Sequence, residues 1–144
     1  MNNIVSNYQK YENYKEQAVR LKKAINSKFY LEALFIEYAI IEDRFESALR
    51  HSGVIIGGGK YVGLNRKLSK MEAVAREKKS LANKYFKPEL FESVKLWKEE
   101  RNRLMHALMK QSLTTEELQN LSEKGQLLVK KLCSVTTSYN RKIK

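Results

Sequence analysis

An arginine interrupts an otherwise regular helical pattern in the second half of the chain, and an asparagine and a histidine follow it. Arg101 falls on a stripe of apolar residues, where a packed helix would normally carry another apolar side chain. A guanidinium keeps its charge, so it occupies a helix interface only when an anion, a partner or water meets it. Asn102 follows directly, and His106 is one of only two histidines in the chain. This grouping predicts a functional site. The stripe comprises Leu90, Val94, Trp97, Leu104 and Leu108.

Other sequence features that could carry chemistry are weaker. Glu42, Asp43 and Glu46 bring carboxylates close together, but no second carboxylate or histidine cluster stands at metal-ligand spacing. These acids are interpreted mainly as a solvated helix face, with one able to brace an arginine. The single cysteine, Cys133, excludes a disulfide or a cysteine-based zinc site within one chain. We therefore expect no metal and no cofactor.

The glycine-rich segment 53–63 resembles a phosphate-binding loop only superficially. Val54 stands where the first glycine should be, and Tyr61 replaces the Ser or Thr that would bind magnesium. No strand is predicted before it. The segment is predicted to be a flexible loop between helices, or a short hairpin.

The charge balance favours anionic partners. The chain holds 28 Lys and Arg against 16 Asp and Glu, a formal net charge of +12. Nine basic residues and two glutamates lie between Lys60 and Lys87. That region is either a phosphate-backbone binding surface or merely a soluble outer face.

The elements that must position Arg101 and His106 are helices. We predict helices over about Tyr8–Ile25, Lys28–His51, Leu64–Phe86 and Pro88–Met109, and a last one that follows a capping box at Thr114–Glu117. Gly125 in the last helix would let a neighbour approach closely. The prediction is one all-α domain, residues 1–144, built as a single bundle of about five helices. With no signal-peptide pattern and no apolar run of membrane-spanning length, a cytoplasmic protein without membrane contact is expected.

The segment Arg101-Asn102-Arg103-Leu104-Met105-His106 resembles the signature of the HEPN superfamily. That signature is an arginine, a polar residue that is often asparagine, and a histidine four to six positions beyond the arginine. The spacing here is Arg-x4-His, with asparagine directly after the arginine. A small all-α domain, a strongly apolar earlier helix and a motif in a late helix agree with the family's architecture.

The resemblance implies a metal-independent endoribonuclease with Arg101, Asn102 and His106 as catalytic residues. His106 would act as general base or acid when the ribose 2′-hydroxyl attacks the adjacent phosphate. Arg101 would hold that phosphate, and Asn102 would orient the histidine or the phosphate by hydrogen bonding. Arg103 and Lys110 would contact the RNA backbone. On one straight helix Arg101 and His106 point about 140° apart, so the resemblance implies a homodimer that brings two copies of the motif together at its axis.

Two other interpretations stay open at this stage. Some HEPN domains bind RNA, nucleotides or proteins without cleavage. Alternatively, the chain is a structural helical module in which Arg101 pairs with a nearby glutamate and His106 caps a carbonyl. The resemblance further implies a toxin or phage-defence role, often with a nucleotidyltransferase-like antitoxin as partner.

Overall fold

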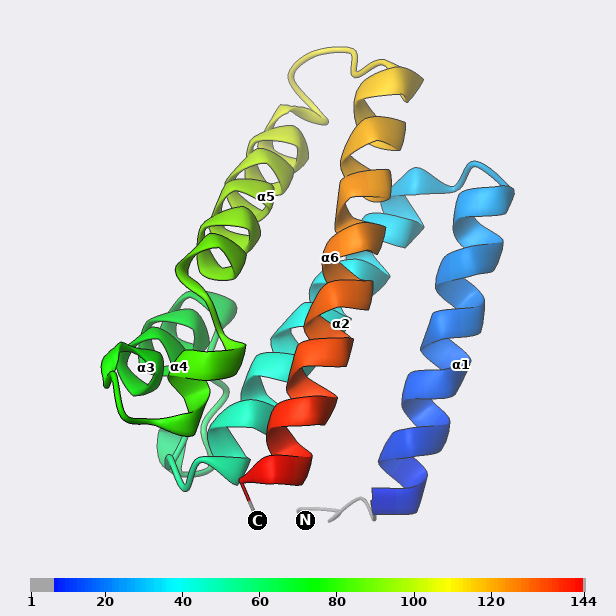
Figure 1. The fold of residues 1–144 in the computed structure, drawn as a ribbon. Helices are drawn as coiled ribbons and strands as arrows, with labels where there is room; N and C mark the ends of the chain where they lie inside the picture. Colours follow the sequence, from blue (N-terminus) through cyan, green and yellow to red (C-terminus); the bar gives the residue numbers. More distant parts are fainter. Residues whose placement is uncertain (1–6, 144) are drawn as a thin grey trace.

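The computed structural model describes residues 7–143, which form an all-α bundle (Figure 1). The predicted fold class is confirmed, since six α-helices and one short 3₁₀ turn account for the regular structure of these residues. None of these helices is long and apolar enough to cross a membrane. The elements are α1 (Asn7–Asn26), α2 (Tyr30–His51), η1 (Gly57–Gly59), α3 (Leu64–Arg76), α4 (Leu81–Tyr85), α5 (Pro88–Ala107) and α6 (Thr115–Lys142).

Helix α2 is the central strut of the bundle, as its apolar composition predicts. It packs against α6 most extensively, and also against α1 and α3. Helices α1 and α5 lie on either side of α6, and the shorter α3 and α4 lie beside the start of α5 (Figure 1). The α2 side chains that are fully shielded from solvent are Ala33, Leu34, Glu37, Ile41, Phe45, Ala48 and Leu49.

The prediction of one continuous helix over Leu64–Phe86 is wrong, because the helix is interrupted between α3 and α4. Ser80 caps α4, where its hydroxyl accepts a hydrogen bond from the Asn83 amide at 3.3 Å. The same hydroxyl lies 2.7 Å from the Glu77 carbonyl, and the Asn83 side chain donates to the Ala75 carbonyl at 2.7 Å. Short polar side chains of this kind compete with helical backbone bonds and favour caps and turns. Ser80 and Asn83 therefore end one helix and begin another.

The glycine-rich loop forms a 3₁₀ turn rather than a hairpin. Gly57, Gly58 and Gly59 all have positive φ, a conformation that favours glycine. The next helix begins only at Leu64, so Lys60 is not at a helix N-terminus as a phosphate-binding loop would require.

Helices α5 and α6 begin where the sequence predicts. Pro88 opens α5, and Thr114 caps α6 by accepting from the Glu117 amide at 3.1 Å. The Glu117 carboxylate in turn accepts from the Thr114 amide at 3.1 Å, which completes the capping box.

Gly125 permits the close packing that holds α5 and α2 against α6. A Cβ atom at this position would lie 2.6 Å from the Glu37 carboxyl carbon and 2.8 Å from Trp97 Nε1. Trp97 Nε1 donates to the Leu121 carbonyl of α6 at 3.0 Å. This buried bond fixes α5 one turn before Arg101, so it sets the position of the motif relative to the core.

Candidate active site

Arg101 lies half-buried on the face of α5 that turns toward α2. Its guanidinium carbon is 4.2 Å from the centre of the Tyr38 ring, a cation–π contact. The buried residues Trp97 and Leu104 flank it along α5, which confirms that the arginine interrupts the apolar stripe. Its Nε atom is buried and makes no hydrogen bond to any residue from 7 to 143.

No carboxylate within residues 7–143 forms an ion pair with Arg101. The neighbouring Glu100 instead lies 3.8 Å from Lys124, and Glu99 is exposed to solvent. Within the described part of the chain, the one polar contact of the guanidinium is a long hydrogen bond of 3.5 Å from Nη1 to Asn102 Oδ1. Burial lowers the pKa of Arg101, but a guanidinium remains charged in proteins. A structural module would need Arg101 to pair with a nearby glutamate, and no such pair exists among the described residues. The guanidinium is therefore available to an external anion.

The Arg101 side chain lines a cavity of about 540 Å³ between α2, α3, α5 and the segment that precedes α3. Lys67 in its wall is almost completely buried, and its Nζ lies 3.0 Å from Glu42 and 3.7 Å from Glu46. The Tyr61 hydroxyl donates to the other Glu42 oxygen at 3.1 Å. The cavity thus has a cationic end at Arg101 and an acidic wall on α2. Its lining residues are Phe35, Tyr38, Ala39, Glu42, Asp43, Glu46, Tyr61, Lys67 and Arg101.

His106 lies at the other side of the helix, in the last turn of α5. Its exposed side chain lines a separate, shallow depression of about 330 Å³. Arg103 and Lys110 line the same depression, so the structure brings together the histidine and both residues that were predicted to contact RNA. Asn102 is also exposed, one turn before His106. No hydrogen bond from His106 to a carbonyl is present among the described residues, so the cap that a structural role would need is not seen there.

Arg101 and His106 therefore line different cavities of one chain. This separation agrees with the angle expected for five residues on a straight helix. A single chain does not present both groups to one substrate atom.

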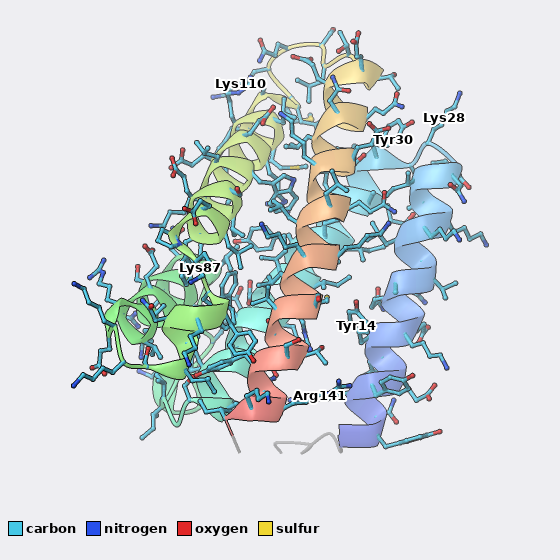
Figure 2. The ribbon with its side chains drawn as sticks, viewed as in Figure 1. Tyr14, Lys28, Tyr30, Lys87, Lys110 and Arg141 are labelled. Atoms are coloured by element: carbon cyan, nitrogen blue, oxygen red, sulfur yellow. The ribbon has the colours of Figure 1, made fainter. Side chains whose placement is uncertain are left out.

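Apolar side chains are exposed at the end of the bundle where the motif lies. Leu108 and Met109 follow His106, and the Met109 side chain is 92% exposed. Leu31, at the start of α2, is also exposed. Figure 2 shows Tyr30, the chain neighbour of Leu31, at the same end of the bundle as Lys110, the chain neighbour of Met109.

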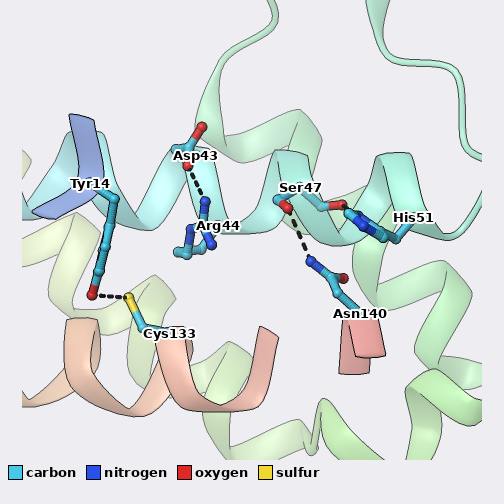
Figure 3. Close-up of polar contacts among 7 residues, drawn as sticks. All are labelled: Tyr14, Asp43, Arg44, Ser47, His51, Cys133 and Asn140. Carbon is cyan, nitrogen blue, oxygen red and sulfur yellow. Dashed lines mark hydrogen bonds and ion pairs between the residues drawn. The ribbon is translucent and has the colours of Figure 1, made fainter. Parts of the chain in front are cut away.

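Several other polar side chains make contacts along α2 and between α1, α2 and α6 (Figure 3). The Tyr14 hydroxyl donates to Cys133 Sγ at 3.0 Å, and burial raises the pKa of both groups, that of Tyr14 to about 12. His51 Nδ1 lies 2.9 Å from the Ser47 carbonyl in the last turn of α2. Within residues 7–143 no group of His, Cys, Asp or Glu side chains is arranged to hold a metal ion.

Comparison with protein-family models, curated proteins and solved structures finds no match to this chain.

Sequence reasoning missed the residues that surround Arg101. Lys67 lies in the segment predicted to be either a phosphate-backbone binding surface or a soluble outer face, and Glu42, Asp43 and Glu46 lie on the predicted solvated face. Asp43 faces solvent in part and pairs with Arg44 at 2.6 Å, so one of these acids does brace an arginine, whereas Glu42 pairs with the buried Lys67. One signal was present in the sequence, because Tyr38, Glu42 and Glu46 recur at intervals of four and so share a face of α2.

Proposed function

We propose that this protein is a metal-independent endoribonuclease of the HEPN type, with an active site assembled across a homodimer. The observation that carries the proposal is the state of Arg101. It is half-buried, held against Tyr38, and without a carboxylate partner among the described residues. An arginine kept in place in this way suits the binding of a phosphate group.

The catalytic roles follow from the chemistry of the three motif residues. The 2′-hydroxyl of a ribose attacks the adjacent phosphorus, and the histidine of one protomer accepts its proton. The bond to the 5′-oxygen breaks, and the same histidine, now an imidazolium, returns its proton to that leaving oxygen. Arg101 stabilises the charge that develops on the non-bridging oxygens. The products are a 2′,3′-cyclic phosphate and a 5′-hydroxyl, and no metal is needed.

Asn102, Arg103 and Lys110 have supporting roles in this scheme. Asn102 accepts a hydrogen bond from Arg101 and lies one turn from His106, so it can orient either side chain. Arg103 and Lys110 share the depression of His106 and would hold the RNA backbone on both sides of the scissile bond.

A symmetric dimer accounts for the two separate cavities. A two-fold axis near the end of α5 would bring the Arg101 side of one protomer toward the His106 side of its partner. Leu31, Leu108 and Met109 are exposed at this end, and a dimer would shield them from water. By the same family resemblance, the biological role is that of a cytoplasmic toxin or defence factor, held in check by a nucleotidyltransferase-like antitoxin.

A non-catalytic RNA- or nucleotide-binding module is the second candidate. It is favoured by one observation, namely that Arg101 and His106 line separate cavities in a single chain. Such a module would bind RNA through Arg101 and would not turn it over.

RNA cleavage in the presence of EDTA tests the proposal. Wild-type protein is compared with Arg101→Ala and His106→Ala, and the mass of each protein in solution is recorded. Arg66→Ala and His51→Ala are matched controls, because both residues lie outside the two cavities. Cleavage by a dimeric wild type and by both controls, and its loss in both motif variants, would support the nuclease. If the dimeric wild type binds a broad panel of RNAs and leaves them intact, the binding module is correct.

A further inference from the structure

The cavity beside Arg101 has features that a phosphate-binding site does not require. Tyr38, Glu42 and Glu46 line it from successive turns of α2, and Asp43 adds a third carboxylate. These acids would repel a second phosphate group. The volume of the cavity, about 540 Å³, is within the usual range for small-molecule sites. A ligand that places one phosphate at Arg101 must therefore present hydrogen-bond donors to the acidic wall.

The three carboxylates differ in how far they are already engaged. Glu42 has one oxygen 3.0 Å from Lys67 Nζ and the other 3.1 Å from the Tyr61 hydroxyl. Asp43 is bound to Arg44 at 2.6 Å. Glu46 makes only a 3.7 Å contact with Lys67, and its side chain is 37% exposed. Glu46 is thus the carboxylate on this wall with both oxygens able to accept hydrogen bonds from a ligand.

Aromatic side chains stand at the opening of the same cavity. Phe35 is 69% exposed and Tyr61 is 81% exposed, although both line the cavity. Lys67 Nζ lies 5.7 Å from the centre of the Tyr61 ring and contributes positive charge on that side. Exposed aromatic rings beside cations are suited to stacking on nucleobases.

We propose that this cavity is a base-binding subsite that selects guanine, with Glu46 as the specificity-determining residue. The inference rests on the proposed ribonuclease function, because it takes the phosphate at Arg101 to be the one next to the bound nucleotide. The Tyr38 ring holds the Arg101 guanidinium. Glu46 lies eight residues beyond Tyr38 along α2, which is about 12 Å by the rise of a helix. That separation suits a nucleotide whose phosphate is at Arg101 and whose base edge reaches Glu46.

Guanine fits this wall because of its pattern of donors. Its N1–H and N2–H₂ groups are adjacent, and a carboxylate accepts from both at once. Adenine and cytosine each offer one amino group beside a ring nitrogen that is an acceptor, and that nitrogen would face a carboxylate oxygen. Uracil offers one N–H between two carbonyl oxygens. Only guanine satisfies both Glu46 oxygens without repulsion.

Binding of mononucleotides tests the subsite without relying on cleavage. Titration calorimetry would compare 3′-GMP, 3′-IMP and 3′-AMP on the wild-type protein at one salt concentration. We expect 3′-GMP to bind about tenfold or more tightly than 3′-AMP, since adenine cannot donate two hydrogen bonds to the Glu46 carboxylate. Because inosine lacks the N2 amino group, 3′-IMP should lie between them.

Two variants complete the experiment. Glu46→Gln should reduce the preference for 3′-GMP over 3′-AMP to about twofold or less, while Glu92→Gln, at an exposed site on α5 outside the cavity, should retain it. Equal binding of the three nucleotides, no binding of 3′-GMP, or an unchanged preference in Glu46→Gln would overturn the subsite. RNA cleavage without guanine preference would refute the subsite and keep the nuclease. Selective binding of 3′-GMP by a protein that cleaves no RNA would refute the nuclease and keep the subsite.

Discussion

Arg101 is held by the aromatic ring of Tyr38, with 4.2 Å between the guanidinium carbon and the ring centre, and no acid among the described residues pairs with it. A carboxylate partner would have to be displaced before a phosphate could bind. An aromatic ring holds the cation in position and leaves its hydrogen-bond donors available. The arrangement therefore prepares the arginine for an anion at little energetic cost.

The Tyr38 ring should accordingly matter more than its hydroxyl. We expect Tyr38→Ala to lower kcat/KM for RNA cleavage about tenfold, in keeping with roughly 1–2 kcal/mol for a partly desolvated cation–π contact. Tyr38→Phe keeps the ring and should stay within about threefold of wild type. Steady-state cleavage of one fixed RNA measures both variants. An equal loss in the two would mean that the hydroxyl, and not the ring, is what Arg101 needs.

Lys67 should be important for stability because it is buried with Glu42. Replacing it by Met leaves the Glu42 carboxylate, which is largely shielded from water, without its cationic partner. Breaking one side of a buried pair destabilises a protein by about 3 kcal/mol. Urea unfolding would measure this loss in Lys67→Met, and the double variant Lys67→Met/Glu42→Gln should recover much of it. If the double variant is no more stable than the single one, the ion pair is not the cause.

Glu37 should make the free energy of unfolding fall as the pH rises. Its side chain is fully buried against Gly125, and neither carboxylate oxygen has a hydrogen-bond partner among the residues that the structure describes. Burial raises its pKa to about 9. In the unfolded chain the carboxyl ionises near its ordinary value of 4.5. Between these two values the folded state binds the extra proton, so this group lowers the free energy of unfolding as the pH rises.

Urea unfolding of Glu37→Gln at several pH values between 5 and 8 tests this effect. The wild type should lose stability with rising pH relative to the variant, whose amide does not titrate. Glu92→Gln, with an exposed carboxylate replaced, should follow the wild type. Parallel curves for the wild type and Glu37→Gln would show that Glu37 is not held in its protonated form.

The dimer should depend on the apolar side chains beside the motif. Met109→Glu introduces a charge at a 92% exposed position next to the proposed axis, so it should yield a folded monomer that does not cleave RNA. Leu127→Glu changes another exposed apolar residue, in the groove between α5 and α6, and should remain dimeric. Sedimentation measures the mass and circular dichroism checks the fold. A dimeric, active Met109→Glu protein would place the interface elsewhere.

The parts of the fold that follow local rules were predictable from sequence. Apolar spacing predicts α2 and α5, Pro88 predicts the start of α5, and the pair Thr114 and Glu117 predicts the start of α6. The division of α3 from α4 was not predicted, because the apolar pattern continues across Ser80. The break depends on hydrogen bonds that the Ser80 and Asn83 side chains make to the backbone.

The candidate site was predictable only in part, for a similar reason. Arg101 was recognised because it violates a periodic pattern within one helix. The cavity beside it joins residues of α2 and α3 to α5, and its acidic wall depends on which glutamate Lys67 meets. Such contacts are set by packing between distant segments, which a periodic pattern does not encode. The buried carboxyl of Glu37 was missed for the same reason, since its sequence position only places it on α2.

Mixing two inactive variants tests most directly whether the active site is shared between protomers. Arg101→Ala and His106→Ala are each purified, confirmed as inactive dimers, and then mixed under conditions that allow the subunits to exchange. A mixed dimer holds one intact arginine and one intact histidine, on different chains. If the site is shared, cleavage by an equal mixture should return to about a quarter of the wild-type rate, because half of the dimers are mixed and each mixed dimer contains one of the two Arg101–His106 pairs. A mixture that exchanges its subunits and still cleaves no RNA would contradict the shared site.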